Sequence, residues 1–440
     1  MRLRTSDLAV AALGELLGPD VEIDGASIDS REIRSGQLFV PIVADRDGHE
    51  YIGAALARGA AAYLASDREV IAVHGGSAVL VADTRRALQD AGRLARARLS
   101  PPVVGITGSV GKTSVKDLLA AALSRTLRTT ASQRSFNNEM GVPLTLLGAP
   151  DRTEAVVVEM GARDVGHIAE LCGIAEPTVG IVTRVAAVHT EIFGSIDDVA
   201  RAKSELVRAL PAHGTAVLNA ADGRVAAMAS VTPAAVVTFG EGGDVRADDV
   251  ALDAQLRARF RLRSPWGDVD VALGSRGRHQ VDNALAAASA ALVCGVGLED
   301  VAAGLSEALL SPWRMELATA PGGAVVLNDA YNANPTSVAA ALEALVALPA
   351  ERRIAVLGVM AELGPTSDAD HAAIGTLAEK LGIRLVAVDA PAYGGEQVGS
   401  AEEALDLLEP LGPGDAVLVK GSRVAGLERL AELLLGEPRP

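Results

Sequence analysis

The segment VVGITGSVGKTS, residues 103–114, constrains the fold of this chain more than any other. Its β-branched start predicts a buried strand at 103–107, a glycine-containing loop follows at 108–111, and apolar residues at helical spacing come next. Strand, glycine loop and helix in this order are the context of a phosphate-binding loop, in which N–H groups at a helix N-terminus surround an anion. In such a loop Lys112 would reach the β- and γ-phosphates, and the Thr113 hydroxyl would ligate Mg²⁺.

The loop departs from the full phosphate-binding pattern at one position. That pattern has a glycine five residues before Gly111, where this chain has Ile106. A chance turn of glycine-rich composition is therefore the alternative to a nucleotide site. We interpret the segment as a nucleotide site, because the strand and helix that such a site needs flank it. The predicted nucleotide contacts are Thr107, Gly108, Ser109, Val110, Gly111, Lys112 and Thr113.

Length and charge limit what surrounds this loop. A chain of 440 residues exceeds what one hydrophobic core organises, so two or three domains are expected. A net charge of −16 with 2% aromatic residues argues against a nucleic-acid partner. The longest uncharged run, 283–298, is too short to span a bilayer. The N-terminal apolar residues form a helical stripe rather than a signal peptide, so we expect a cytoplasmic protein without a membrane partner; the stripe is Leu8, Ala12, Leu13, Leu16 and Leu17.

The pattern of strands and helices predicts an α/β fold with three domains. Residues 1–98 predict a small α/β domain, and the prolines at 101 and 102 end it. Residues 99–311 alternate apolar strands with helices, which predicts a central parallel-sheet ATPase domain covered on both faces. Residues 312–440 repeat this alternation and predict a Rossmann-like domain. The expected strands are 37–43, 62–65, 78–81, 103–107, 155–160, 178–183, 215–219, 235–239, 324–328, 353–359, 385–389 and 416–420.

One part of the central region differs from this alternation. In residues 255–273, apolar residues alternate with arginines and then, after a turn, with aspartates, which predicts an antiparallel hairpin with one exposed face. The arginine row could bind nucleic acid. A charge-paired face, with Asp268 and Asp270 opposite the arginines, is the interpretation that we favour.

Three side chains beyond the loop are candidates for chemistry. Glu159 closes an apolar strand, and burial there would be costly unless the carboxylate were paired or bound a metal. His189 follows the next strand and would reach the same rim, although a structural role is an equal alternative. Lys203 lies within the apolar face of the helix that begins after Ser195. Its stem could reach water by snorkelling, or it could be a site lysine that is charged by phosphate or chemically modified.

Polar segments elsewhere remain ambiguous from the residues alone. Ser30 and Arg31 could hold a phosphate, but an exposed turn arginine explains them better. Asparagines favour turns, so the pairs Asn137 with Asn138 and Asn332 with Asn334 do not by themselves indicate a site.

Together, the motifs of this chain resemble those of the Mur ligase family, the ATP-dependent amide-forming enzymes of peptidoglycan synthesis. The resemblance covers essentially the whole chain in the family's order, and His189 stands fourteen residues before Lys203 as in that family. The matching segments are 29–31, 47–49, 107–113, 136–143, 158–162, 277–286, 313–316, 328–335, 360–364 with His371, and 419–422. At 41–49 the chain is one residue shorter than its relatives, which leaves the uridine contacts of this loop open.

The resemblance implies roles for the nucleotide and metal residues. Ile106 is explained, because these enzymes use a shortened Gly-x-x-Gly-Lys-Thr loop. Lys112 and Thr113 would bind the ATP phosphates and Mg²⁺, while Glu159 and His189 would serve the metal. Lys203 resembles the family lysine that becomes carbamylated and then binds Mg²⁺. The positions that match adenosine and phosphate contacts across the central and C-terminal domains are Asn283, Arg314 and Asp329.

The resemblance also implies the substrates and the reaction. Residues 1–98 would bind the UDP-sugar with Ser30 and Arg31, and residues 312–440 would bind the incoming dipeptide. Further substrate contacts would come from Asn137, Asn138, Asn332 and Asn334. The segment 331–335 favours a ligase that joins D-alanyl-D-alanine to UDP-N-acetylmuramoyl-tripeptide through an acyl phosphate. We expect a monomer, although the sequence does not fix the oligomeric state. The alternatives are another amino-acid ligase of the family, or a P-loop kinase or switch NTPase.

Overall fold

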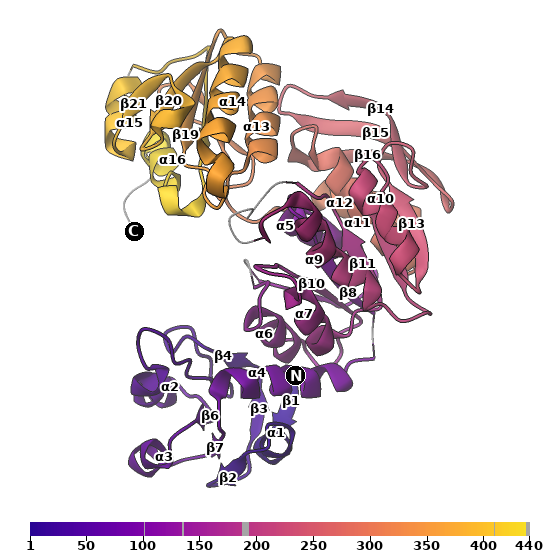
Figure 1. Ribbon diagram of the computed structural model, residues 1–440, viewed down its shortest axis with the longest axis vertical. Helices are drawn as coiled ribbons and strands as arrows, with labels where there is room; N and C mark the ends of the chain where they lie inside the picture. The colour runs from indigo at the N-terminus through magenta and orange to yellow at the C-terminus, as the bar shows by residue number, and fades with distance from the viewer. Residues whose placement is uncertain (101, 134–135, 187–192, 409, 437–440) are drawn as a thin grey trace.

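The computed structural model describes residues 1–440 except 101, 134–135, 187–192, 409 and 437–440. It is an α/β structure in which three domains follow one another along the chain (Figure 1), and this confirms the predicted fold class. Each of the three predicted regions contains its own sheet, while the boundaries at 98/99 and 311/312 stay predictions. In the described part of the chain, no helix combines the length and the apolar character that crossing a membrane requires.

The N-terminal domain is built on a five-stranded sheet in the order β2-β7-β6-β5-β4. Strand β2 is antiparallel to β7, and the other neighbours are parallel. A separate antiparallel pair joins β1 and β3. The bounds are β1 Arg2–Arg4, β2 Glu15–Leu17, β3 Glu22–Asp24, β4 Ala26–Ser27, β5 Leu38–Phe39, β6 Ala62–Ala65 and β7 Ala78–Leu80, with helices α1 Thr5–Ala11, α2 Ile52–Ala57, α3 Arg68–His74 and α4 Thr84–Ala97.

The predicted N-terminal helix is correct at its start and wrong at its end. Helix α1 ends at Ala11, and Leu16 and Leu17 lie in β2 instead, paired with strand β7. Leu13 has a left-handed φ of 50°, and a Cβ on Gly14 would lie 2.5 Å from the carbonyl oxygen of Leu80. The glycine therefore lets the chain turn against β7, which a continued helix could not do. The strand expected at 37–43 is likewise shorter, because within it only β5 lies in the sheet, and Val43 forms an isolated bridge with Asp47.

The central domain contains a six-stranded parallel sheet in the order β13-β12-β11-β8-β10-β9. All five strands predicted for it are present, and β9 was missed. Two separate hydrophobic clusters cover its faces. The bounds are β8 Val103–Thr107, β9 Thr129–Ala131, β10 Ala155–Glu159, β11 Val179–Val182, β12 Thr215–Asn219 and β13 Ala235–Phe239, with helices α5 Lys112–Leu123, α6 Gly141–Leu147, α7 His167–Ala175, α9 Ile196–Arg208, α10 Gly223–Ala227, α11 Gln280–Val293 and α12 Leu298–Glu307.

The predicted charged hairpin is part of a three-stranded antiparallel sheet, β14 Arg246–Leu252, β15 Arg257–Ser264 and β16 Gly267–Arg276. Arg261 donates to Asp270 at 3.0 Å, and Arg263 pairs with Asp268 across the turn. The charge-paired interpretation is therefore confirmed. Arg263 also pairs with Asp248 of β14 at 3.0 Å, a strand that the sequence pattern did not reveal.

The C-terminal domain is a second doubly wound sheet, in the order β17-β18-β22-β19-β20-β21. Only β17 runs antiparallel to its neighbour among these described strands. Hydrophobic clusters lie on both faces. The bounds are β17 Glu316–Thr319, β18 Val325–Asn328, β19 Arg352–Gly358, β20 Arg384–Val388, β21 Glu396–Val398 and β22 Asp415–Lys420, with helices α13 Pro335–Ala347, α14 Ser367–Lys380, α15 Ala401–Leu408 and α16 Glu428–Leu435.

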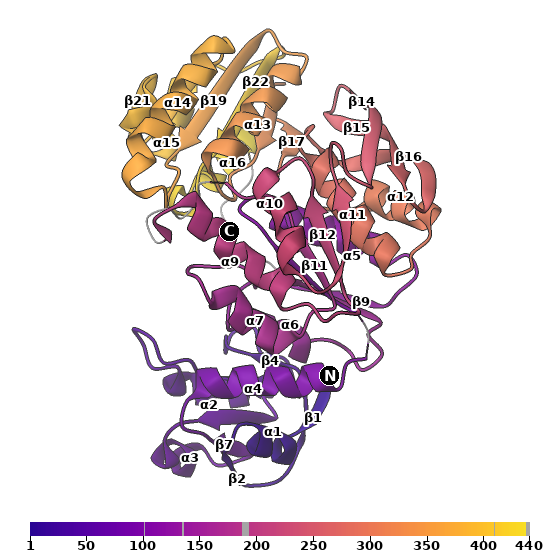
Figure 2. The same cartoon turned by 45° about the vertical axis from the view of Figure 1, so that its right-hand side comes forward.

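The N-terminal domain meets the central domain through α4, which lies beneath α6 and α7 (Figure 2). The contact is close, because a Cβ on Gly92 of α4 would lie 2.8 Å from the Cβ of Pro143 in α6. Arg96 donates to the carbonyl oxygens of Ala175 at 2.8 Å and Glu176 at 3.1 Å, at the end of α7. These orphan carbonyls of a helix C-terminus are satisfied by a side chain from the other domain.

The C-terminal domain is attached through a linker that is held by helix α5. The N–H of Ser311 donates to Asp117 at 2.7 Å, five residues past Lys112 on that helix. Asp117 also pairs with Lys116 at 2.9 Å, and Lys116 donates to the carbonyl oxygen of Ser132 at 2.9 Å. The helix that begins at the glycine loop therefore holds the start of the linker as well.

Candidate active site

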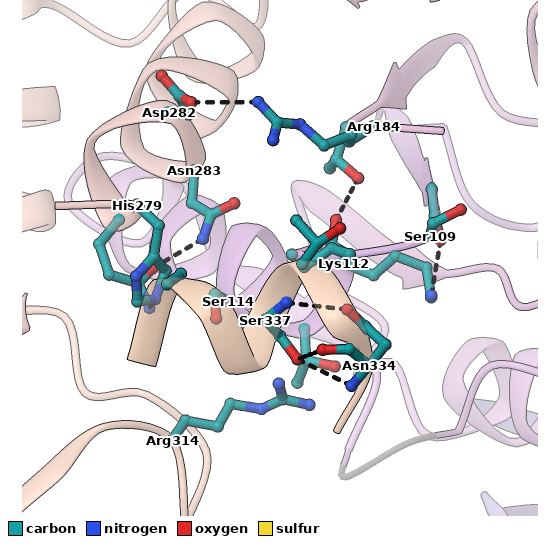
Figure 3. Close-up of a pocket in the computed structure, with 18 of the residues that line it drawn as sticks. Ser109, Lys112, Ser114, Arg184, His279, Asp282, Asn283, Arg314, Asn334 and Ser337 are labelled. Carbon is teal, nitrogen blue, oxygen red and sulfur yellow. Dashed lines mark hydrogen bonds and ion pairs between the residues drawn. The ribbon is translucent and has the colours of Figure 1, made fainter. Parts of the chain in front are cut away.

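A cleft of about 1620 Å³ lies between the central and C-terminal domains, and the glycine loop forms part of its wall. The central domain contributes the loop, the ends of β10 and β11 and the start of α11, while the C-terminal domain contributes the segments after β18, β19 and β22. Figure 3 shows Lys112, Asn283, Arg314 and Asn334 around one opening. Residues far apart in the sequence thus meet at the carboxyl ends of two parallel sheets, which is where α/β folds bind ligands.

The loop has the backbone geometry of an anion cradle. Gly108 and Gly111 have φ values of 144° and 88°, which L-residues with a side chain rarely adopt. A Cβ at Gly108 would collide with the Thr183 hydroxyl, and one at Gly111 would collide with the side chain of Asn283. Both glycines are therefore required, and helix α5 begins directly after them. The free N–H groups at its start are suited to bind phosphate oxygens.

Lys112 is a half-buried cation at this loop. Its Nζ donates to the carbonyl oxygen of Gly108 at 2.7 Å, and no ion pair to a described carboxylate satisfies its charge. Burial lowers the pKa of Lys112, and the carboxylate of Glu159 partly offsets this effect. A half-buried ammonium group that lies next to a ring of backbone N–H groups fits the phosphates of a nucleotide.

Glu159 lies beside the loop and presents oxygen atoms together with Thr113. It is 2% exposed, and its carboxylate accepts from the Thr113 hydroxyl at 2.8 Å and from the Asn137 amide at 2.9 Å. The expectation of a buried, paired carboxylate is thus met. Among the described residues no three His, Cys, Asp or Glu side chains form a metal cluster. Mg²⁺ typically uses one or two protein oxygens plus phosphates and water, so the Glu159–Thr113 pair fits it. His189 lies outside the described residues.

Lys203 is buried as its helical phase predicted. Ser195 caps α9 by accepting the N–H of Asp198 at 3.1 Å, and Lys203 is 2% exposed and lines the cleft. Its Nζ lies 5.8 Å from the centroid of the Phe193 ring. Burial, reinforced by the charge of Lys112, lowers the pKa of Lys203 to about 7. Its amine therefore does not reach bulk water, and the snorkelling alternative fails.

The three expected adenosine and phosphate contacts all line the cleft. Asn283 lies against Gly111, and its amide donates to Gln280 at 2.9 Å. The guanidinium of Arg314 lies 4.3 Å from the centroid of the Tyr331 ring. Asp329 pairs with Lys420 and accepts the N–H of Met315 at 3.2 Å. The structure therefore brings these residues from two domains to one site.

Other expected contacts have local structural partners. Thr107 does not line the cleft, because its buried hydroxyl donates to the carbonyl oxygen of Met160 at 2.9 Å. The Ser109 hydroxyl bonds the backbone of Ala186 at 3.0 Å and 3.1 Å. Val110 lines the cleft in the loop itself. These loop residues can therefore offer a ligand their backbone groups more readily than their side chains.

The asparagine pairs also line the cleft, although they act partly as caps. Asn138 accepts the N–H of Gly141 at 2.9 Å, at the start of α6. Asn334 caps α13 by accepting the N–H of Ser337 at 2.9 Å, and Asn332 accepts the next N–H of its own turn at 2.9 Å. The carbonyl oxygen of Asn332 also accepts from Lys420 at 2.8 Å. Their position is as expected, and their contacts with a substrate stay predictions.

Ser30 and Arg31 do not belong to the cleft. They lie in the N-terminal domain, where the Arg31 side chain is 83% exposed and pairs with Asp29 at 2.7 Å. This is the exposed turn arginine that the residues alone favoured. A role in binding a second part of a long substrate stays a prediction.

Sequence reasoning missed the role of Lys420 as a cleft residue. It is 2% exposed, and its Nζ donates to Asp329 and to Asn332 from the end of β22. The signal was present, since Lys420 closes an apolar strand just as Glu159 does. Glu362, which also lines the cleft, gave no such signal because it lies in a loop.

Comparisons with known proteins agree with this site. Residues 106–291 match the family model of the Mur ligase middle domain, and 313–423 match that of the Mur ligase glutamate ligase domain. The chain is 39% identical to the UDP-N-acetylmuramoyl-tripeptide–D-alanyl-D-alanine ligase of Mycobacterium tuberculosis, over 98% of each chain. Its fold matches MurF from Acinetobacter baumannii with a TM-score of 0.89 at 32% identity over 99% of both chains. MurF from Thermotoga maritima in complex with ADP matches with a TM-score of 0.81 at 28% identity, over 94% of this chain and 97% of that one.

Proposed function

The chain belongs to the Mur ligase family, and we propose that it is the ATP-dependent ligase that joins D-alanyl-D-alanine to UDP-N-acetylmuramoyl-tripeptide in peptidoglycan synthesis. The observation that carries this proposal is the cleft, in which the glycine loop of one domain faces Arg314, Asp329 and the 331–334 turn of another. A P-loop kinase or switch would have no need for this second wall. The full-length match to dipeptide-adding enzymes favours this reaction over that of a sister ligase.

The residues at the loop define the first step. Lys112 and the N–H groups at the start of α5 hold the phosphates of ATP while the carboxylate of the tripeptide is phosphorylated. The buried oxygens of Thr113 and Glu159 would hold Mg²⁺, which offsets the charge of the transferring phosphoryl group. Lys112 acts in a buried site, where a positive charge stabilises developing negative charge more than it would in water.

The second step needs the other wall of the cleft. The amine of the dipeptide attacks the acyl phosphate, an amide bond forms, and phosphate leaves. An acyl phosphate is hydrolysed if water reaches it, so the C-terminal domain must close over the site. Asn332 and Asn334 line the cleft from the C-terminal domain and would contact the dipeptide. Asn137 and Asn138 line it from the central domain, where Asn137 bonds Glu159, and would contact the tripeptide.

The N-terminal domain would bind the UDP-sugar end of the substrate, with Ser30 and Arg31 at its exposed turn. Residues 1–98, 99–311 and 312–440 then bind the UDP-sugar, ATP and dipeptide in turn. We place the enzyme in the cytoplasm, where ATP is available, and expect it to act as a monomer because one chain contains all three parts.

Lys203 is proposed to act as a carbamate. Its neutral amine would add CO₂ and release a proton, so that a buried cation becomes an anion with two oxygen ligands for Mg²⁺. Its burial in the cleft and its closeness to Lys112 support this, because two ammonium groups at the wall of one cleft would repel each other and a metal. His189 would bind the same metal ion.

One experiment tests the reaction. Phosphate release from ATP is measured with UDP-muramoyl-tripeptide and with D-alanyl-D-alanine, diaminopimelate or lysine as the amine. Among the three amines, we expect only D-alanyl-D-alanine to support turnover. Equal or better use of a single amino acid would assign the chain to a sister ligase, and release that ignores both substrates would indicate a switch.

A second experiment tests the carbamate. The protein is equilibrated with ¹³C-bicarbonate, and its carbon spectrum is compared with those of Lys203→Arg and Lys116→Arg. We expect a carbamate signal in the wild type and in Lys116→Arg, since Lys116 is buried outside the cleft. The signal should vanish in Lys203→Arg. A spectrum without that signal in any of the three proteins would overturn the proposal.

A further inference from the structure

Glu362 has a backbone conformation that its side chain disfavours. It lies in the loop after β19 with a φ of 67°, in the left-handed region that favours glycine or asparagine. The next residue but one, Gly364, also has a positive φ of 60°. Strained conformations of this kind cluster at functional sites, and Glu362 lies at the wall of the cleft.

The neighbours of Glu362 fix this loop from both sides. The N–H of Met360 donates to the Nε2 of His371 at 2.9 Å, and the N–H of Ala361 donates to the Ser422 hydroxyl at 2.9 Å. On the other side, Leu363 is 2% exposed in the core of the domain. Glu362 itself is exposed and lines the cleft. The loop therefore presents this one carboxylate toward the site.

His371 can only support the loop in its neutral form. Its Nε2 accepts the N–H of Met360, so the proton lies on Nδ1, which donates to the carbonyl oxygen of Ser367 at 2.6 Å. The ring is 3% exposed and packs edge-on against Tyr393, with the centroids 4.6 Å apart. His371 is thus a positioning residue for the loop and does not reach the cleft.

The charge of Glu362 acts on the reaction centre from the opposite wall. Its carboxylate lies near enough to Lys112 to raise the pKa of that lysine, although burial dominates. Glu343 and Glu362 both bring carboxylates to this wall, and of the two it is Glu362 whose charge acts on Lys112. Two cations of the same wall pair with other carboxylates, Lys420 with Asp329 and Arg423 with Glu428 at 2.6 Å.

The incoming amine has the complementary charge. An α-amino group has a pKa near 8, so most of the dipeptide arrives as an ammonium ion at neutral pH. The cations that hold phosphate and carboxylate groups would repel it. An ammonium ion needs an acceptor near the acyl phosphate, and a carboxylate provides a charge-assisted hydrogen bond.

We propose that Glu362 binds the ammonium group of the incoming D-alanyl-D-alanine and thereby places its nitrogen beside the activated carboxyl at Lys112. This inference rests on the proposed function. It assigns the recognition of the amine to a loop residue of the C-terminal domain.

The test compares two nucleophiles in Glu362→Gln. Hydroxylamine is neutral at the assay pH and traps the acyl phosphate as a hydroxamate, so it needs no ammonium acceptor. We expect Glu362→Gln to lose a much smaller fraction of its kcat/KM with hydroxylamine than of its kcat/KM with D-alanyl-D-alanine. The KM for D-alanyl-D-alanine should rise by at least ~10-fold, as for the loss of a charged hydrogen bond. The matched control Glu379→Gln removes an exposed carboxylate of the same domain and should change neither rate.

A second variant separates recognition from structure. Glycine adopts a φ of 67° without strain, so Glu362→Gly should have a Tm equal to or above that of the wild type while its KM for the dipeptide rises as in Glu362→Gln. An unchanged KM in both variants overturns the inference and leaves the ligase function intact. If the wild-type protein forms hydroxamate but does not use D-alanyl-D-alanine, both the role of Glu362 and the proposed ligase function are overturned.

Discussion

The two domain boundaries of this molecule are built in opposite ways. Between the N-terminal and central domains, one hydrophobic cluster runs through both, joining Leu38 and Leu64 to Val142 and Ile168. Between the central and C-terminal domains, the clusters are separate, and Leu256 is the one described central residue that packs in a C-terminal cluster. The cleft occupies the rest of that boundary, with charged and amide side chains on both walls.

This difference between the two boundaries indicates which domain can move. Separating the first boundary would expose apolar surface to water at a cost of about 25 cal/mol per Å². Opening the second boundary mainly hydrates polar groups, so its cost is small. The N-terminal and central domains therefore form one platform, and the C-terminal domain is the part that can open and close. Changes at the cleft should alter activity, and changes at the α4 boundary should alter stability.

The largest effect is expected at the cleft. Lys112→Ala should lower ATP-dependent ligation by at least ~10³-fold, because it removes the charge that faces the phosphates. The Tm should stay within about 2 °C of the wild type, since burial of this cation does not favour folding. Phosphate release and thermal unfolding measure the two quantities, with replacement of the exposed Lys380 at the end of α14, Lys380→Ala, as the control. Activity within a few-fold of wild type would remove the nucleotide assignment.

At the α4 boundary, Gly92→Val should mainly destabilise. Its new Cβ would lie 2.8 Å from the Cβ of Pro143 and 3.2 Å from Ile174, so the two domains must shift apart. We expect a loss of about 2–3 kcal/mol in the free energy of unfolding, as for overpacked cores. The turnover per folded molecule should stay near that of the wild type.

The control for Gly92→Val is Gly173→Ala on α7, where nothing lies within 4 Å of an added Cβ. That variant should be neutral or slightly more stable, as for glycine replaced by alanine in a helix. Denaturant unfolding measures both. Equal stability of Gly92→Val and the wild type would contradict a close-packed boundary.

Arg96→Met should have a smaller effect at the same boundary. The variant leaves the carbonyl oxygens of Ala175, Glu176 and Leu99 without the guanidinium that bonds them. A loss of about 2 kcal/mol is expected for a half-buried charged donor. Arg98→Met removes an exposed arginine that pairs with Asp7, and it should change stability by less than about 0.5 kcal/mol. Indistinguishable unfolding curves for the two variants would mean that the helix end does not need this cap.

The smallest expected effect is a dependence of the free energy of unfolding on pH, which arises from Lys203 in the cleft. The pKa of Lys203 is lowered to about 7 by burial, whereas an unfolded lysine has a pKa near 10.4. Above pH 7 the unfolded chain therefore binds more protons, and the free energy of unfolding rises with pH, by up to about 1.4 kcal/mol per unit. Below pH 7 both states are protonated and this contribution is constant.

The pH slope is measured as Tm between pH 6 and 8.5 in bicarbonate-free buffer. Lys203→Met should flatten the curve above pH 7. Gly92→Val should instead lower the Tm by the same amount at every pH, because no titrating group lies in its contact. Parallel curves for the wild type and Lys203→Met would refute the burial argument for this lysine.

The sequence predicted best what depends on local pattern. The β8–loop–α5 unit needs β-branched residues, two glycines and an apolar helix face, and all of these are contiguous. Lys203 was found because its helix has a single apolar face. Short edge strands were missed, since β17 and β21 are half-exposed and contain polar residues without alternation. Strand β2 was mistaken for helix because Leu13, Leu16 and Leu17 have helical spacing, whereas the turn at Gly14 depends on packing against β7.

The site was predictable in part, for a related reason. Residues that close apolar strands, such as Glu159, can be placed at a sheet edge from sequence. Glu362 cannot, because its position depends on His371 and Ser422, which bond its loop from eleven residues away and from another strand end. Whether Ser30 and Arg31 contact a ligand depends on how far a bound substrate extends, which the pattern of residues does not encode.

The bond between Ser311 and Asp117 has a mechanical consequence. Asp117 stands five residues past Lys112 on α5, about 7.5 Å along the helix axis, so a rotation of the C-terminal domain at Ser311 would have its axis near the glycine loop. Displacement in a rotation grows with distance from its axis. Arg314, three residues beyond the pivot, has a short lever arm, while the far end of the domain sweeps a long arc. A small rotation at Ser311 would therefore widen the far side of the cleft enough to admit the amine, while Arg314, close to the axis, would barely move.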